Sequence, residues 1–401
     1  MPATDESSRV TGAPTLPLLE GVTVLDLSTV GPAARATRLL ADFGATVIKV
    51  GPVPASGTVM ITPAYFAYSG HRGMRRVELD LKAESGRQAM EALAASADVL
   101  VESFRPGVTE RLGIGYEQLH QCNDQLIYCS TSGYGQQGPM SQWAGHDVDY
   151  LALGGFLATS ERRADGGPPL PGATVADSAA GGMHAVMAIM AALVGRQATG
   201  RGCHLDVAVA DGVLWIMSLA IDEHLALGTH PGPGRDLLTG GFACYSTYAG
   251  SDGRWLAVGA IEHKFYATLC TELGCSRWID QQMDPDVQAA IRTDFASAFA
   301  GATRDEWIER LSDLDTCVAP VLAVAEIPES PHVLGRALVI DAHHPTHGGF
   351  RQLAPLLAGM TRPEGTVHSP DLTETATDEL LAAAGIGNEI IARWRDEGVI
   401  A

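Results

Sequence analysis

Short runs of aliphatic and β-branched residues alternate with helix-like patterns through the first hundred residues of the chain. Residues 22–27 and 46–50 predict two strands, and the break at Gly31 and Pro32 followed by residues 33–42 predicts a helix between them. Residues 76–81, 84–95 and 98–102 repeat the order strand, helix, strand. Because consecutive parallel strands are usually joined by a helix, these two units predict an α/β fold whose parallel sheet has helices on its faces.

The pattern changes in the second half of the chain. A small-residue helix is predicted at 179–194, a strand at 203–209 and a helical run at 211–227. The stretch 230–234, rich in proline and glycine, is typical of a linker, and residues 242–248 and 255–258 predict a hairpin that turns at 251–253. Two polar helices are predicted near the C-terminus, at 377–383 and 388–397.

Four segments follow from this pattern. We expect a disordered tail at 1–17, which is rich in serine, threonine, proline and glycine, and a large domain at 18–227. A smaller α+β domain is expected at 228–338, and a C-terminal segment at 339–401 should return to the large domain.

Composition indicates a globular, cytoplasmic protein. The chain has 401 residues, of which 46% are hydrophobic and 18% charged, so it can bury a large core. We find no apolar run long enough to span a bilayer, and the polar N-terminus does not look like a secretory signal. The seven cysteines form no CxxC pair, which favours reduced thiols over disulfides or a zinc site.

The charge of the chain restricts its ligands. A formal net charge of -20 argues against nucleic-acid binding and would repel any phosphate-bearing ligand at long range. A cluster of cations in the first part of the chain could offset this repulsion locally, although from the residues alone scattered, solvated surface charges are the simpler explanation for these cations. No GxGxxG motif follows the first predicted strand and no P-loop is present, so a dehydrogenase or an ATPase is not expected. The cluster consists of Lys49, Arg72, Arg75, Arg76, Arg105 and Arg111.

Three short segments supply an acid/base set. Residues 145–150, 175–177 and 259–262 contain His146, Asp177 and Glu262. An imidazole and two carboxylates can move protons near neutral pH, although Asp177 could equally be a helix N-cap. Asp147 and Asp149 lack a third spaced ligand, so capping roles are expected and no metal site is predicted.

Three methionines recur at helical spacing after Asp177: Met183, Met187 and Met190. Core packing is the simpler explanation for them, and an adaptable apolar surface for an acyl chain is the alternative.

Residues 25–27 with 31–32, 40–45, 79–82 and 104–108 with 111–113 resemble the CoA-binding core of the family III CoA-transferase superfamily. Residues 145–150, 175–177, 237–241 and 259–262 resemble its alpha-methylacyl-CoA racemase branch. The resemblance implies a Rossmann-like large domain, an interlocked homodimer, an acyl-CoA thioester substrate and no further cofactor. It also implies CoA contacts from Lys49, Arg72, Arg75, Phe104, Arg105, Arg111, Tyr134 and Gly135. The chain departs from the family pattern at Gly51, where an acidic residue is frequent, and at His71 and Met74, where an Asn and a Lys are frequent.

In the racemase branch, the residues matching His146 and Asp177 act as two bases on opposite faces of the α-carbon. Glu262 would accept a hydrogen bond from the second ring nitrogen of His146. The resemblance thus implies an epimerase of 2-methylacyl-CoA thioesters that works through an enolate, with the acyl group left open. The alternatives are a CoA-transferase in which Asp177 is the covalent nucleophile and a non-catalytic CoA-ester binder.

Overall fold

The computed structural model describes residues 17–54, 70–371 and 373–401. The predicted disordered tail lies outside the described residues except for Pro17. Two compact units share the chain: the described residues within 17–154, 172–216 and 332–401 contribute to the first, and residues 155–171 and 217–331 form the second. The second unit thus includes residues 155–171, which the predicted small domain, 228–338, did not contain. Ala158 and Arg162 of that segment line a small cavity together with residues 231–233.

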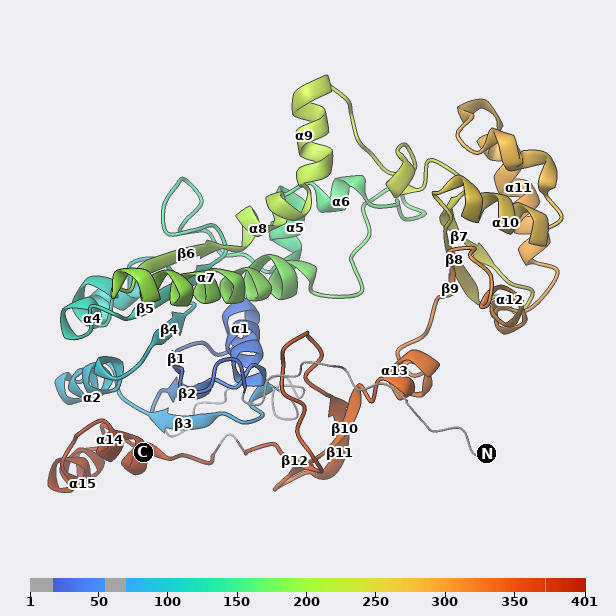
Figure 1. Cartoon of the computed structure of the whole chain (residues 1–401). Helices are drawn as coiled ribbons and strands as arrows, with labels where there is room; N and C mark the ends of the chain where they lie inside the picture. The colour runs from blue at the N-terminus through green and yellow to red at the C-terminus, as the bar shows by residue number, and fades with distance from the viewer. Residues whose placement is uncertain (1–16, 55–69, 372) are drawn as a thin grey trace, which may run out of the picture. The chain divides into compact units, whose positions relative to one another are not determined.

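A six-stranded parallel sheet forms the centre of the first unit and confirms the predicted α/β class (Figure 1). Every strand predicted in the first hundred residues is present. The strand order is β3-β2-β1-β4-β5-β6. From β1 the chain first adds strands on one side of the sheet and then, with β4, on the other side. Open α/β sheets bind ligands at such a switch point. The strands are β1 (Thr23–Asp26), β2 (Thr46–Gly51), β3 (Arg75–Glu78), β4 (Val99–Glu102), β5 (Ile127–Ser132) and β6 (His204–Ala208).

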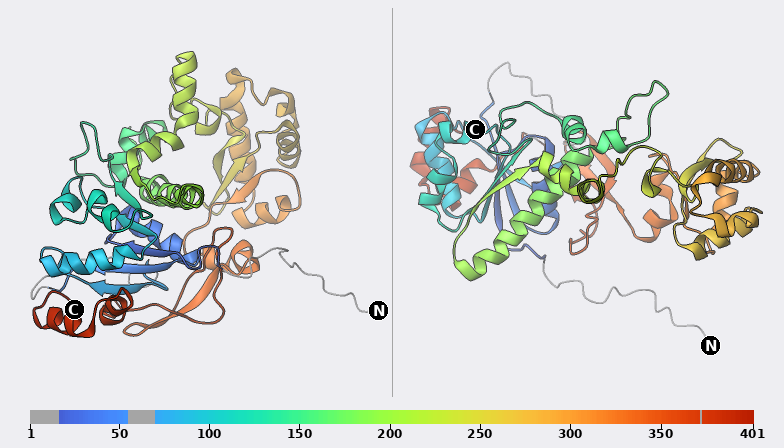
Figure 2. Two further views of the ribbon diagram at one scale, coloured as in Figure 1. Left: turned by 60° about the vertical axis from the view of Figure 1, so that its left-hand side comes forward. Right: turned by 90° about the horizontal axis from the view of Figure 1, so that it is seen from above.

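Helices cover both faces of this sheet. On one face, α1 (Gly31–Asp42) and α7 (His184–Thr199) bury a core that includes Val24, Leu40 and Ile189. On the other face the core includes Met90, Leu119 and Trp394, and the C-terminal helices lie beside α2 in both views of Figure 2. The covering helices of that second face are α2 (Glu84–Ala95), α4 (Tyr116–Cys122), α14 (Thr377–Ala383) and α15 (Asn388–Asp396).

The last residues of the chain are bound to the sheet edge at β3. The Asp80 N–H donates to the Val399 carbonyl at 2.8 Å, and Leu79 forms an antiparallel bridge with Ile400. Thr377 Oγ1 donates to the Ala401 carbonyl at 2.6 Å. The C-terminal segment therefore closes one face of the first unit.

Two predicted helices are each divided in the structure. The run predicted at 179–194 begins as a π-helix, η2 (Ala176–Met183), and continues as α7. The run predicted at 211–227 is interrupted at Met217 into α8 (Val209–Ile216) and α9 (Ser218–Leu227). Further helices in the chain are α3 (Val108–Leu112), α5 (Asp147–Leu153), α6 (Phe156–Thr159) and α13 (Pro331–Gly335).

Within the described residues, one helical stretch, Ala176–Thr199, is long and apolar enough to cross a bilayer by length and composition. The sequence analysis did not expect such a stretch. Ala185 and Ile189 in it are fully buried in the core beneath the sheet, whereas Met187 and Val194 are 57% and 67% exposed.

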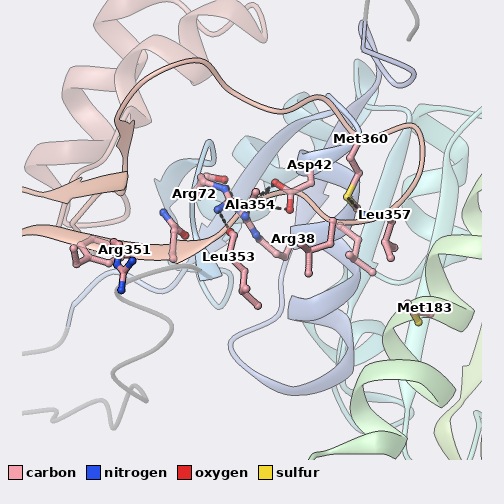
Figure 3. Close-up of a pocket in the computed structure, with 13 residues that line it drawn as sticks. Arg38, Asp42, Arg72, Met183, Arg351, Leu353, Ala354, Leu357 and Met360 are labelled. Carbon is pink, nitrogen blue, oxygen red and sulfur yellow. Dashed lines mark hydrogen bonds and ion pairs between the residues drawn. The ribbon is translucent and has the colours of Figure 1, made fainter. Parts of the chain in front are cut away.

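A small sheet, with strand order β11-β10-β12, also belongs to the first unit. Arg72 joins it to α1, because its guanidinium bonds the Asp42 carboxylate at 3.1 and 3.2 Å and the Leu353 carbonyl at 2.8 Å (Figure 3). Its strands are β10 (Val339–His344), β11 (Gly348–Leu353) and β12 (Val367–His368).

The second unit is built on the antiparallel sheet β7-β8-β9, with the predicted hairpin between β7 (Tyr245–Ala249) and β8 (Trp255–Gly259) and with β9 at Val318–Pro320. Tyr266, Phe295 and Phe299 fill its core. Its helices are α10 (His263–Glu272), α11 (Gln288–Phe299) and α12 (Arg304–Leu311), and its 3-10 turns are η3 (Leu237–Thr239), η4 (Ser276–Gln281), η5 (Pro285–Val287) and η6 (Ile327–Glu329).

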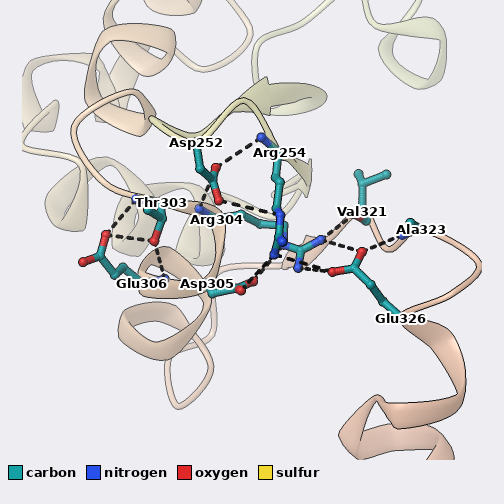
Figure 4. A network of polar contacts seen from close by, with 9 residues as sticks. All are labelled: Asp252, Arg254, Thr303, Arg304, Asp305, Glu306, Val321, Ala323 and Glu326. Atoms are coloured by element: carbon teal, nitrogen blue, oxygen red, sulfur yellow. Dashed lines mark hydrogen bonds and ion pairs between the residues drawn. The ribbon is translucent and has the colours of Figure 1, made fainter.

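An arginine network ties α12 to the end of this unit. The buried Arg304 guanidinium bonds Glu326 at 2.7 and 3.1 Å, Asp305 at 2.8 Å and the Val321 carbonyl at 3.0 Å (Figure 4). The hydrogen bond from Arg304 is the largest cause that lowers the pKa of Glu326, to about 2.

Candidate active site

His146 stands at the start of α5, where backbone contacts hold it in place. It occupies the N-cap position, and the Asp149 carboxylate accepts a hydrogen bond from the His146 backbone N–H at 2.9 Å. Its side chain is exposed. The predicted capping role of Asp149 is confirmed.

Asp147 links His146 to the second predicted base. Its Oδ1 accepts a hydrogen bond from the backbone N–H of Asp177 at 2.9 Å, so the start of α5 and the start of η2 are held together. The charge of His146 is among the causes that lower the pKa of Asp177. The structure therefore brings His146 and Asp177 into one site, although they are far apart in sequence.

The Asp177 carboxyl is an unusually basic one. Burial raises its pKa above the ordinary value, the nearby charge of Arg35 lowers it, and Asp147 raises it again. Arg35 Nη2 lies 4.0 Å from Asp177 Oδ2. A partly buried carboxylate beside one cation is suited to accept and return a proton.

The alternative interpretation of Asp177 as an N-cap is wrong. The N-cap of η2 is Val175, and Asp177 lies inside the first turn. Two of the first amides of the helix already donate hydrogen bonds. The Asp177 N–H donates to Asp147 Oδ1, and the Ser178 N–H donates to the Thr174 carbonyl at 3.0 Å. These two amides therefore already have acceptors within the protein.

Close packing of glycines against α1 positions Arg35. A Cβ on Gly181 would lie 2.4 Å from the Pro32 Cβ, and one on Gly182 would lie 3.0 Å from the Arg35 Cβ. Larger residues in η2 would push α1 away from Asp177. The sequence analysis did not identify Arg35, and an arginine one turn into the helix after Gly31 and Pro32 was the available signal.

Glu262 lies in the second unit, at the N-cap of α10. Gln282 holds the preceding turn, because its Nε2 donates to the Ala260 carbonyl at 3.0 Å and to the Ile261 carbonyl at 2.7 Å. The hydrogen bond from His146 to Glu262 stays a prediction.

A cavity of about 680 Å³, here called the β1–β2 cavity, lies at the carboxyl ends of β1 and β2, beside the switch point of the sheet. Lys49, Arg76 and Lys82 supply cations to its wall, and His71 and Phe104 line it as well. Its position and size suit a phosphate-bearing ligand with an aromatic part.

Hydrogen bonds inside the protein hold the ammonium group of Lys49 in place. Its Nζ donates to Asp26 Oδ2 at 2.9 Å and to the Ser28 carbonyl at 2.6 Å, and the Asp26 side chain is fully buried. Hydroxyls of Ser28 and Thr37 also bond the Asp26 carboxylate. Lys49 therefore neutralises a buried charge in the wall of the cavity.

Arg76 is a cavity cation that the sequence analysis placed in the basic cluster but did not select as a CoA contact. It bonds Glu78 at 3.1 Å. A Cβ on residue 51 would lie 2.5 Å from Arg76 Nη2. Gly51 thus leaves room for the arginine.

Of the eight residues predicted to contact CoA, Lys49 and Phe104 line the β1–β2 cavity. Arg72 bonds Asp42 on α1, and Arg75 forms an ion pair with Glu379 at 2.6 Å. The structure places the other four elsewhere in the first unit: Arg105 and Arg111 are exposed, Tyr134 packs edge-on against Tyr150, and Gly135 is buried.

The three predicted acyl-chain methionines differ in exposure. Met183 and Met187 are 39% and 57% exposed, so the core-packing explanation is wrong for them. Met190 is partly buried against the core beneath the sheet. As to metals, within the parts of the chain that the structure describes no three His, Cys, Asp or Glu side chains gather as a metal site would require.

Glu102, at the end of β4, gives the first unit a pH-dependent stability. Burial raises its pKa from 4.5 to about 7, while hydrogen bonds from Ser130 and the Phe104 amide lower it. The folded state therefore holds this proton in a window where the unfolded state has lost it, so the free energy of unfolding should fall as the pH rises from 4.5 to 7. Glu102→Gln should weaken this dependence by on the order of 3 kcal/mol. Urea unfolding of the wild-type protein and of Glu102→Gln at pH 5 and pH 8 would measure this change. An equal change in the free energy of unfolding between the two pH values for both proteins would contradict the role given to Glu102.

Comparison with known proteins agrees with this geometry. The model of CoA-transferase family III matches residues 19–374. The chain is 35% identical to alpha-methylacyl-CoA racemase of Mus musculus over 96% of this chain and 97% of that protein, and 30% identical to acetyl-CoA:oxalate CoA-transferase of Acetobacter aceti over 80% and 85%. A crystal structure of a CaiB/BaiF family protein from Brucella suis is 26% identical and superposes with a TM-score of 0.73, covering 93% of this chain and 99% of that one. The chain therefore belongs to CoA-transferase family III, with alpha-methylacyl-CoA racemases among its relatives.

Proposed function

We propose that this protein epimerises 2-methylacyl-CoA thioesters by two-base proton transfer and needs no cofactor beyond the CoA of its substrate. The observation that carries the proposal is the Asp147 bridge: Asp147 Oδ1 accepts a hydrogen bond from the Asp177 N–H at 2.9 Å and so joins the start of α5, which carries His146, to the start of η2, which carries Asp177. An exposed imidazole next to a basic carboxyl is what removal and return of an α-proton requires.

The proton transfer has a simple sequence. One of the two groups takes the α-proton, the electrons move onto the thioester oxygen to give a planar enolate, and the other group delivers a proton to the opposite face. The raised pKa of Asp177 helps this step, since a stronger base gains more from the transfer. Glu262, supplied by the second unit of a partner subunit, would hold the ring of His146 in one tautomer.

A family III CoA-transferase is the second candidate. In that reaction the Asp177 carboxylate attacks the thioester carbonyl, CoA leaves as a thiolate, and a mixed anhydride forms. The thiolate then attacks the Asp177 carbonyl of the anhydride, which gives an enzyme-bound CoA thioester and releases the first acid as its carboxylate. The relationship to acetyl-CoA:oxalate CoA-transferase supports this reading, as does Arg35, which could steady a second carboxylate near Asp177.

Incubation of one epimer of a 2-methylacyl-CoA in deuterated water decides between the candidates. We expect α-deuterium incorporation and both epimers without any added acceptor acid, because each base exchanges its proton with solvent. A strict need for a free carboxylic acid, together with a hydroxylamine-sensitive adduct on Asp177, would establish the transferase instead.

A homodimer forms part of the proposal. The helix α9 has no buried residue, and its leucines Leu219, Leu225 and Leu227 are 69%, 76% and 74% exposed. Apolar patches of this kind usually mark an interface. A second copy of the chain would cover them and bring a Glu262 to the site.

A further inference from the structure

A second cavity, here called the α1–β11 cavity, extends along the outer side of α1 and has a volume of about 690 Å³ (Figure 3). That size is within the range of about 300–1,000 Å³ found for small-molecule sites. Most of its wall is apolar. The apolar part includes Leu39, Met183, Leu353, Ala354, Leu357 and Met360.

Arg38, Arg72 and Asp42 form one charged group in the wall of this cavity, and Arg351 lines the cavity as well. Arg38 bonds Asp42 at 3.0 Å and the Arg72 carbonyl at 3.0 Å, and Arg72 bonds the same Asp42 at 3.1 and 3.2 Å. The side chains are largely buried: Arg38 is 15% exposed, Asp42 12% and Arg72 6%. Two cations therefore share one anion, and the group carries an excess positive charge with little access to water.

The environment of Arg38 disfavours its charged form, as the direction of its pKa shift indicates. Burial lowers its pKa to about 10, Asp42 raises it, and the charge of Arg72 lowers it further. A buried cation that is only partly neutralised is stabilised by a further anion. Guanidinium groups, with five N–H donors each, can bind a second carboxylate while they keep the first.

Helix α1 and η2 connect this cavity to the surroundings of Asp177. Ser28 and Thr29, just before α1, line the β1–β2 cavity. Within α1, Arg35 lies beside Asp177, and Arg38, Leu39 and Asp42 line the α1–β11 cavity. At about 1.5 Å per residue, Asp42 is about 10 Å along the helix from Arg35. Met183, at the end of η2, lines the cavity from the helix that carries Asp177.

We propose that the α1–β11 cavity receives the far end of the acyl chain and that Arg38 and Arg72 recognise a carboxylate there, several methylenes from the α-carbon. The preferred substrates are then monothioesters of 2-methyl dicarboxylic acids rather than simple fatty acyl-CoA. This inference rests on the proposed function, because it places the α-carbon at Asp177. The methylene spacer lies against the apolar wall, and the terminal carboxylate shares the guanidinium donors with Asp42.

Equilibrium binding by calorimetry tests this without turnover. The probes are the CoA monothioester of a 2-methyl dicarboxylic acid of about ten carbons and its terminal methyl ester, which has the same shape and lacks the charge. We expect the acid to bind at least about tenfold more tightly, since hydrogen bonds to an ionised group are the stronger ones. Equal affinity of the wild-type protein for both probes would overturn the proposal.

Variants separate the charge from the shape of the cavity. Arg38→Met should weaken the preference without abolishing it, because Arg72 and Arg351 remain in the lining. It should leave the affinity for the methyl ester within about twofold, because the apolar wall is kept. Arg362→Met is the matched control, since Arg362 lies in the same part of the first unit and does not line the cavity; it should keep the full preference. If Arg38→Met does not fold, Arg38→Lys keeps a cation and should keep part of the preference.

The outcome is distinguishable from failure of the proposed function. Preferential binding of the acid without α-deuterium exchange would uphold the cavity assignment and reject the epimerase. Exchange with no preference for the acid would uphold the epimerase and reject the cavity assignment.

Discussion

Asp177→Asn should lower the rate of epimerisation in both directions by about 10²- to 10⁴-fold, the usual contribution of one positioned base. The asparagine amide has nearly the size of the carboxyl, and the backbone N–H that Asp147 holds is unchanged, so the site should keep its shape. The loss would then reflect proton transfer alone. NMR of each pure epimer in deuterated water measures it, because exchange should persist only from the epimer whose proton faces His146.

His146→Ala supplies the matched experiment with the opposite stereochemistry. Exchange should persist through Asp177 from the other epimer, while inversion is lost because it needs a donor on each face. If both epimers lose exchange equally in His146→Ala, the two groups do not serve opposite faces. Glu262→Gln should be milder than either change, since it removes only the partner of the ring.

Lys49→Met should destabilise the protein by about 3–5 kcal/mol, the usual cost of leaving a buried charge without its partner. The Asp26 side chain has no access to solvent, and Lys49 Nζ is its cationic partner at 2.9 Å. The methionine fills a similar volume, so the change tests the charge rather than the packing. Denaturant unfolding would show the loss as a lower midpoint.

A second substitution separates the two roles that Lys49 could have. Asp26→Asn combined with Lys49→Met should recover much of the stability, because no unpaired buried charge remains. Arg111→Ala, at an exposed position, should leave the midpoint unchanged and, if it contacts the nucleotide as the family resemblance implies, raise KM more than it lowers kcat. A Lys49→Met protein of normal stability with only a raised KM would show that Lys49 acts mainly on CoA.

Much of the sheet could be predicted because its strands are short apolar runs and their helices begin at recognisable breaks. The helices at 84–95 and 377–383 match α2 and α14 residue for residue. The division of the long run into η2 and α7 could not be predicted, since a π-helix has the same apolar composition as the α-helix that follows it.

The cations show where sequence proximity misleads. Lys49, Arg72, Arg75 and Arg76 form one cluster along the chain, yet neighbouring residues of a strand point to opposite faces of the sheet. Arg76 pairs in register with Lys49 and lines the β1–β2 cavity, whereas Arg75 bonds Glu379 near the C-terminus. That partner comes from the end of the chain, and no local pattern could have identified it.

The attachment of the C-terminal helices to β3 bears on how the protein is made. Leu79, Met90 and Leu93 emerge from the ribosome early, but the residues that cover them, such as Leu381 and Trp394, are synthesised last. At about 5–20 residues per second, this half of the core stays uncovered for on the order of 15–60 s during each round of synthesis. The second unit is complete once residue 331 has emerged. The later-encoded unit can thus finish folding first, and the nascent first unit is the part of this protein that most needs a chaperone.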